Sequence, residues 1–179
     1  MGADHGVALM MPPPTLMLQR IAANLETELN RRLELVFPQW RADREIGVLL
    51  PKDERYNPEP DVTVIDLDIG IDQLYAERFY FVGEVLSEFN RPELRPGSDV
   101  PVVLARKIAY YQAHENCRAV LILRQDRVEA TLYARPNGFV PAHLTAPADR
   151  LVIPDIGDIG CLAQLYRHTP LWQPAFVGP

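Results

Sequence analysis

The chain has 179 residues and a mass of 20.3 kDa, with 47% hydrophobic and 23% charged residues, so it can bury a core without disulfides or a structural metal. Its net charge of −6, from 24 acidic and 18 basic residues, argues against a protein that holds nucleic acid by bulk electrostatic attraction. The two cysteines are too few for a disulfide framework, and no apolar run is long enough for a membrane span, so we expect a cytoplasmic protein of one domain.

The N-terminal part predicts an arm followed by a long helix. Residues 1–14 contain glycines and end in three consecutive prolines, which favours a flexible arm. Thr15 can cap a helix, and apolar residues then recur every three or four positions as far as Leu33, which predicts an amphipathic helix over residues 16–35. We expect a single domain over residues 15–169 and a C-terminal tail over residues 170–179.

The middle of the chain predicts strands separated by charged loops. A short apolar stretch predicts a strand at residues 46–50, and the proline-rich, charged residues 52–60 predict a loop. Residues 61–67 and 79–86 are rich in β-branched and aromatic residues, which predicts two further strands. The second is apolar at both alternating positions, which is typical of a strand covered on both faces. Residues 88–97 predict a loop.

The second half of the chain predicts a helix and more strands. Ser98 or Asp99 can cap a helix that continues to about residue 115. Residues 119–123 and 128–133 predict strands joined by a four-residue turn, residues 151–153 predict another strand, and residues 159–166 predict a short helix. The order of elements indicates a mixed α/β domain.

Glu84 interrupts the apolar strand at residues 79–86. An ionised carboxylate in such a place is unfavourable unless a cationic side chain, a metal ion or protonation compensates it. One interpretation is a salt bridge to an arginine, and the other is a functional role. Asp61 favours the functional interpretation, because it follows Pro60 at the start of the neighbouring strand. Two carboxylates that converge there can bind a divalent cation, and Mg²⁺ is commonly held by one or two carboxylates with water and substrate phosphate.

Lys107 is the third candidate residue. It is one of only two lysines among 18 basic residues, and it lies in the helix that follows the acidic strands. Tyr111 lies one turn further on the same side of that helix, so both side chains can project toward the same point. The alternatives are a solvated surface lysine and a tyrosine packed on the sheet.

These residues together resemble a bacterial family of restriction endonucleases in the PD-(D/E)XK, or restriction-endonuclease-like, nuclease superfamily. The residues that carry the resemblance are Pro60-Asp61, the segment Glu84-Val85-Leu86-Ser87, and Lys107 with Tyr111. The resemblance extends over roughly residues 15–166, and it implies a central mixed β-sheet flanked by α-helices.

The resemblance also implies hydrolysis of DNA phosphodiester bonds with Mg²⁺ or Mn²⁺ as cofactor. By that resemblance Asp61, Glu84 and the backbone carbonyl of Val85 are metal ligands, and Lys107 is the cation near the scissile phosphate. The usual superfamily lysine lies two residues after the glutamate, where this chain has Leu86. The family places its lysine on the following helix instead, which matches Lys107.

Two hypotheses follow from the sequence. The first is a metal-dependent DNA endonuclease, in which Tyr111 and Arg106 position the phosphate and a homodimer cleaves both strands. Its DNA-binding arginines, if they share a face, are Arg31, Arg32, Arg41, Arg44 and Arg106. The second is a catalytically inactive module of the same fold, used for nucleic-acid or protein binding, with Glu84 paired to an arginine. A water-sized gap between Asp61 and Glu84 would favour the enzyme.

Overall fold

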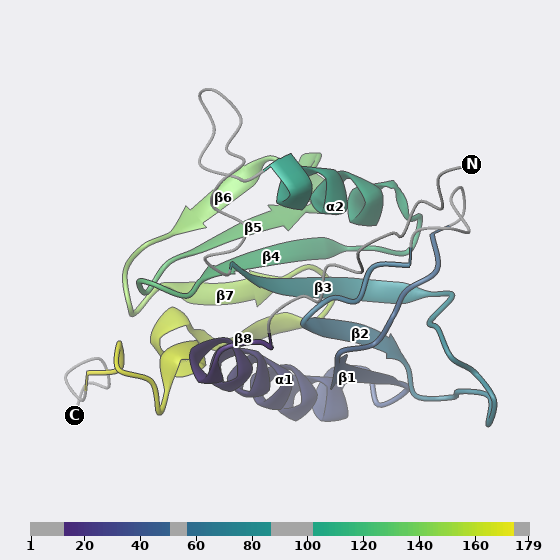
Figure 1. Ribbon diagram of the computed structural model, residues 1–179, viewed down its shortest axis with the longest axis horizontal. Coiled ribbons are helices and arrows are strands. Elements are labelled where there is room, and N and C mark those ends of the chain that lie inside the picture. Colours follow the sequence, from purple (N-terminus) through teal and green to yellow (C-terminus); the bar gives the residue numbers. More distant parts are fainter. Residues whose placement is uncertain (1–12, 51–56, 87–101, 174–179) are drawn as a thin grey trace, which may run out of the picture.

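The structure is a computed structural model that describes residues 13–50, 57–86 and 102–173 (Figure 1). Two α-helices, eight strands and two 3₁₀ helices are found in these ranges. In chain order they are α1 (Leu16–Val36), β1 (Trp40–Arg44), β2 (Val62–Asp66), β3 (Phe79–Leu86), α2 (Val102–Ala113), β4 (Ala119–Arg124), β5 (Ala130–Ala134), η2 (Arg135–Asn137), β6 (Pro141–Leu144), β7 (Arg150–Ile153), β8 (Gly157–Cys161) and η3 (Leu162–Tyr166).

Six strands form one mixed sheet in the order β1-β2-β3-β4-β5-β6. All neighbouring pairs are antiparallel except β3 and β4, which run parallel and are connected through α2. A parallel pair needs such a crossover, because the chain must return to the starting end of the sheet. The strands β7 and β8 form a separate two-stranded sheet. The mixed α/β prediction is therefore confirmed.

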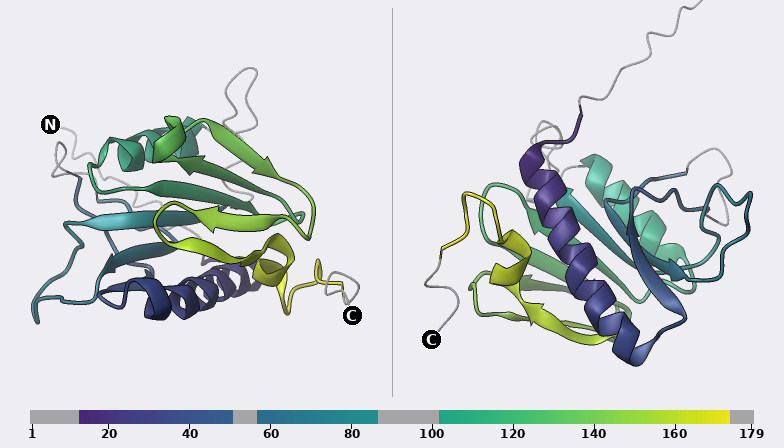
Figure 2. Two further views of the ribbon diagram at one scale, coloured as in Figure 1. Left: turned by 180° about the vertical axis from the view of Figure 1, so that it is seen from behind. Right: turned by 90° about the horizontal axis from the view of Figure 1, so that it is seen from below.

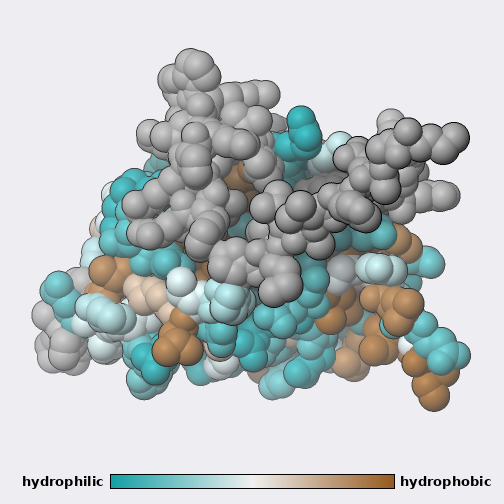
Figure 3. Space-filling model, in the orientation of Figure 1, coloured by the Kyte–Doolittle hydropathy of each residue, from teal (hydrophilic) through white to brown (hydrophobic). Residues whose placement is uncertain are grey.

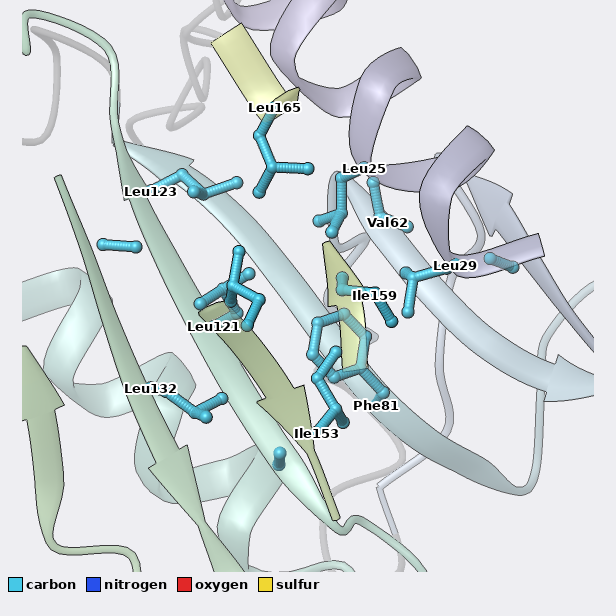
Figure 4. Close-up of a cluster of buried hydrophobic side chains, with 14 of the residues drawn as sticks. Leu25, Leu29, Val62, Phe81, Leu121, Leu123, Leu132, Ile153, Ile159 and Leu165 are labelled. Atoms are coloured by element: carbon cyan, nitrogen blue, oxygen red, sulfur yellow. The ribbon is translucent and has the colours of Figure 1, made fainter. Parts of the chain in front are cut away.

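The two helices cover opposite faces of the six-stranded sheet (Figures 1 and 2). On one face, α1 packs together with β7, β8 and η3 around a large apolar cluster, part of which is shown in Figure 4. On the other face, α2 packs on a second apolar cluster that includes Val82, Leu104 and Ile108. All eight residues of β3 are buried, and the strand contributes side chains to both clusters.

Gly83 allows α1 to approach the sheet closely. A Cβ atom at this position would lie 2.5 Å from Cδ2 of Leu25 on α1, which is closer than carbon atoms can approach without displacement. The glycine therefore sits on the α1 face of β3, and the next residue, Glu84, faces α2. Consecutive residues of β3 therefore serve different faces: Gly83 allows tight packing against α1, and Glu84 places a carboxylate on the α2 face.

The structure differs from the sequence predictions in three places. The strand predicted at residues 46–50 is only an isolated bridge between Val48 and Ala76. The polar segment Trp40–Arg44 forms the edge strand β1 instead, and Pro141–Leu144 forms the second edge strand, β6. The helix predicted at residues 159–166 is divided between the end of β8 and the 3₁₀ helix η3.

Each difference has a physical reason. Strand β1 buries only Ala42 of its five residues, because it is an edge strand, so its sequence carries little apolar signal. Val48 and Leu50 are apolar because they pack into the α2-face cluster without being in a strand. The helix interpretation failed at Gly160, whose positive φ of 119° is incompatible with a continuous helix.

Several predictions lie outside the described residues. These are most of the N-terminal arm, the loop at residues 88–97, the caps Ser98 and Asp99, most of the loop at residues 52–60, and most of the C-terminal tail. The other predicted helices and strands coincide with α1, β2, β3, α2, β4, β5 and β7. None of the helices in the described ranges has the length and hydrophobicity needed to cross a bilayer.

Candidate active site

Asp61 and Glu84 lie on the same face of the sheet. In the antiparallel pairing of β2 with β3, Val62 lies opposite Gly83. Continuing this register by one residue places Asp61, directly before β2, opposite Glu84. Side chains opposite one another in an antiparallel pair project to the same side, so both carboxylates point toward the face that α2 covers. The convergence expected from the sequence is what the structure shows.

The Asp61 side chain is fixed by the backbone of β3. Its Oδ2 atom accepts a hydrogen bond from the backbone N–H of Val85 at 2.7 Å. Strand β2 begins only at Val62, so the aspartate side chain binds a backbone group of the neighbouring strand just beyond the end of β2. This contact holds the carboxylate next to Glu84 and fixes the peptide group between Glu84 and Val85.

Glu84 accepts two hydrogen bonds from α2 on a single oxygen. Its side chain is buried, and its Oε1 atom accepts from the hydroxyl of Tyr111 at 2.7 Å and from the ammonium of Lys107 at 3.2 Å. Lys107 and Tyr111 are one helical turn apart, so both reach the same carboxylate oxygen from one face of α2. The structure thus brings together four of the residues predicted from the sequence: Asp61, Glu84, Lys107 and Tyr111.

The environment of the carboxylate pair raises the pKa of Asp61. Burial, and next the negative charge of Glu84, raise the pKa of Asp61 from 3.8 to about 7. A hydrogen bond from Val85 and the charge of Lys107 oppose this rise in pKa but do not cancel it. The raised pKa of Asp61 means that the half-buried Asp61 beside the buried Glu84 favours an added positive charge, which a proton or a metal ion can supply.

The ligand atoms suit a hard divalent cation. The two carboxylates offer oxygen ligands, which Mg²⁺ and Mn²⁺ prefer. Within the described ranges, no three or more histidine, cysteine, aspartate or glutamate side chains cluster as a metal site. A cation here would therefore be held by the two carboxylates, backbone oxygen and water, which is the usual pattern for Mg²⁺.

Tyr111 and Arg106 differ in what they contact. Tyr111 is fully buried, with its ring edge-on to Phe79 and its hydroxyl bound to Glu84. Tyr111 therefore packs on the sheet, as the alternative interpretation expected, and its hydroxyl also contacts Glu84. Arg106 is exposed on α2, in the residue before Lys107. The role of both residues toward a phosphate stays a prediction, as does that of the Val85 carbonyl.

The arginines expected to bind DNA do not share a face, which corrects that expectation. Arg31 and Arg32 belong to α1, on the opposite side of the sheet from Lys107. Both contact other groups of the protein on that side of the sheet. Arg31 pairs with Glu28 at 2.9 Å, and Arg32 donates to the backbone carbonyl of Ile156 at 2.9 Å. Arginine at these places instead stabilises the α1 layer of the fold.

The edge strand β1 holds two more of these arginines in ion pairs. Arg41 pairs with Asp43 at 3.1 Å, and Arg44 pairs with Glu26 of α1 at 3.4 Å. Of the five arginines predicted to bind DNA, Arg106 is the one on the helix that carries Lys107.

The sequence interpretation passed over Thr63. This residue is two positions after Asp61 in β2, so it projects from the same face of the sheet. The available signal was a polar residue two positions after Asp61, between the apolar residues Val62 and Val64.

Comparison with known families identifies one match over most of the chain. Residues 3–159 match the Uma2 family, which is described as "Putative restriction endonuclease".

A solved structure shows the same fold. It is the crystal structure of a "putative nuclease belonging to DUF820" from Anabaena variabilis, with a TM-score of 0.67 and 13% identity, covering 87% of this chain and 83% of that chain. A curated protein named acireductone dioxygenase from Yersinia enterocolitica serotype O:8 is 29% identical over 103 residues, which are 58% of this chain and 49% of that protein. The chain thus spans about half the length of this curated relative.

The raised pKa of Asp61 predicts how stability depends on pH without metal. The pKa is about 7 in the folded state and near 3.8 in the unfolded state, so the folded state binds more protons between these values. The free energy of unfolding should therefore fall as pH rises from about 4 to about 7. Asp61→Asn keeps the acceptor for Val85 and removes the charge, so we expect it to be more stable than the wild type at pH 8 by roughly 1–2 kcal/mol.

Urea unfolding in EDTA at pH 4.5 and pH 8 measures this effect. Asp68→Asn, at an exposed aspartate after β2, is the matched control and should follow the wild-type pH dependence. Parallel pH curves for the wild type and Asp61→Asn would show that Asp61 is not the group responsible.

Proposed function

Because the chain belongs to the Uma2 family of restriction-endonuclease-like proteins, we propose that it is a metal-dependent endonuclease that hydrolyses phosphodiester bonds of DNA. The observation that carries the proposal is the pair of carboxylates Asp61 and Glu84 on one face of the sheet, with the ammonium of Lys107 in contact with the second. This arrangement offers both a cation site and a positive side chain for an anionic substrate.

Asp61 and Glu84, with the carbonyl of Val85, would hold Mg²⁺ or Mn²⁺. When bound, such an ion neutralises phosphate charge and lowers the pKa of water. The protein fixes the two ligands differently. The backbone of β3 holds Asp61 through Val85, whereas α2 holds Glu84 through Oε1. The two donors from α2 that the structure shows both bind Oε1 of Glu84, and Asp61 lies beside the same carboxylate.

Lys107 would act on the substrate side of the site. Its side chain is about one quarter exposed, at 26%, while that of Glu84 is 8% exposed, so the ammonium lies at the boundary between the buried pair and solvent. From there it can hold a water for attack or stabilise negative charge that develops on the phosphate. Arg106, the exposed neighbour, can contact an adjacent phosphate of the same DNA strand.

The alternative is a non-catalytic module with the same fold. The ion pair of Glu84 with Lys107 favours it, because a buried acid paired with a basic side chain is also a purely structural arrangement. Asp61 favours the enzyme, because its raised pKa indicates a carboxylate whose charge the protein leaves only partly compensated.

Plasmid cleavage tests the proposal directly. Purified protein should convert supercoiled DNA to nicked or linear forms with Mg²⁺ or Mn²⁺ and not with EDTA. Glu84→Gln and Lys107→Met should each lower the rate by a factor of about 100 or more, because each removes a charge that stabilises the transition state. Arg150→Met, which removes an exposed cation of β7 paired with Asp158, is the control and should keep wild-type activity. Equal nicking by all variants would assign the activity to a contaminant.

The hydroxyl of Tyr111 predicts a specific kinetic effect. Tyr111→Phe keeps the packed ring and removes a donor to Glu84, so the carboxylate becomes less well oriented. If Tyr111 orients Glu84, the metal concentration for half-maximal activity should rise about tenfold while KM for DNA stays the same. A rise in KM for DNA without a change in metal dependence would instead assign Tyr111 to phosphate positioning.

We also propose a homodimer, because cleavage of both strands of a duplex needs two sites. Nine large hydrophobic side chains are exposed among the described residues, and five of them lie between β2 and β3. They are Leu67, Ile69, Ile71, Leu74 and Tyr75, with Ile71 fully exposed at 100%. Figure 3 shows hydrophobic surface over this connection at the lower right. Such a concentration exceeds the scattered apolar residues of a monomer surface and suits contact with a second copy.

Light scattering after size-exclusion chromatography tests the dimer. The double variant Ile71→Glu, Leu74→Glu should have half the mass of the wild type and should nick plasmid rather than linearise it. The matched control is Val140→Glu, Val152→Glu, which changes two exposed valines elsewhere and should stay dimeric. A wild-type protein that is monomeric at tens of micromolar would contradict the proposal.

A further inference from the structure

Thr63 has a buried hydroxyl without a partner in the protein. The residue is completely buried, at 0% exposure, and its Oγ1 atom has no hydrogen-bond partner among the described residues. Buried hydroxyl groups are nearly always hydrogen-bonded, because they lose their contacts with water on folding. An exception in the middle of a sheet therefore requires an explanation.

The position of Thr63 relates it to the carboxylate pair. It lies opposite Val82 of β3 and Asp43 of β1, and it is the next residue after Asp61 that projects from the same face of β2. Two residues along a strand correspond to roughly 7 Å between Cα atoms. A separation of this size can be spanned by a single bridging water.

The residues next to Thr63 in β2 show that the strand does not need a hydroxyl at this position. The neighbours of Thr63 in β2 are Val62 and Val64, and valine has the same shape as threonine without the polar atom. A valine at this position would fit the strand and leave no unsatisfied group. The threonine is therefore unfavourable for folding unless its hydroxyl binds something other than the protein itself.

We propose that Thr63 is a positioning residue whose hydroxyl binds a water molecule of the cation that Asp61 and Glu84 hold. This inference rests on the proposed function. Mg²⁺ retains several of its waters when two carboxylates bind it, and these waters need hydrogen-bond partners in the protein. A hydroxyl can both donate to and accept from such waters. Groups that orient metal ligands in this indirect way affect metal affinity by factors of 10–100.

Titration calorimetry with MgCl₂ and MnCl₂ on the full chain tests the role of the hydroxyl. Thr63→Val should weaken Mg²⁺ binding by about tenfold, because it removes the partner of a retained water. Thr63→Ser keeps the hydroxyl and should bind Mg²⁺ like the wild type. The metal-free Tm of Thr63→Val should equal or exceed that of the wild type, because valine removes an unsatisfied polar group.

The outcomes separate this inference from the proposed function. Asp61→Asn should abolish metal binding, and if neither it nor the wild type binds Mg²⁺ or Mn²⁺, both proposals fail together. If Asp61→Asn loses binding but Thr63→Val binds Mg²⁺ with wild-type affinity, the cation site stands and the role of Thr63 is wrong. Should Thr63→Val not fold, Thr63→Ala provides a second variant without the hydroxyl. Equal Mg²⁺ affinity in Thr63→Ala and Thr63→Ser would likewise overturn the inference.

Discussion

The structure depends on the proximity of two acids, Asp61 and Glu84, beside the α2-face apolar cluster of the six-stranded sheet. Antiparallel pairing of β2 and β3 places Asp61 opposite Glu84, and burial of the whole of β3 keeps the glutamate away from bulk water. Neither carboxylate can turn away, because Val85 holds one and α2 holds the other. The fold thus maintains a repulsive contact, whose cost a proton or a cation can offset.

The count of charges separates the two functional interpretations. Among the described residues, Lys107 contacts Glu84, and burial together with the charge of Glu84 raises the pKa of Asp61. A module selected for stability alone would need only Glu84 with its ion pair, or an apolar residue in its place. A divalent cation, if bound as proposed, would supply positive charge together with the capacity for chemistry on phosphate. The partly compensated negative charge at Asp61 and Glu84 therefore favours the enzyme over the non-catalytic module.

The sequence predicted the centre of the site better than its surroundings. Glu84 was detectable because it is the only charged residue of β3, and the register that brings Asp61 beside it comes from the antiparallel pairing of β2 with β3. Strand β1 was missed because it lies at the edge of the sheet and buries only Ala42, so its sequence is mostly polar. The distribution of arginines was unpredictable, because the side of the sheet that α1 covers depends on tertiary packing, as shown by the contact of Leu25 with Gly83.

The pairing of the arginines has a consequence for how the protein would hold DNA. Arg31, Arg41 and Arg44 are each engaged with an acidic side chain, and the net charge of the chain is −6. Long-range attraction to a polyanion is therefore weak, and affinity must come from the few groups at the site. Much of the positive charge that meets the phosphate would then belong to Lys107, Arg106 and the cation itself. Binding of DNA and binding of metal would in that case be coupled, because each lowers the electrostatic cost of the other beside Asp61 and Glu84.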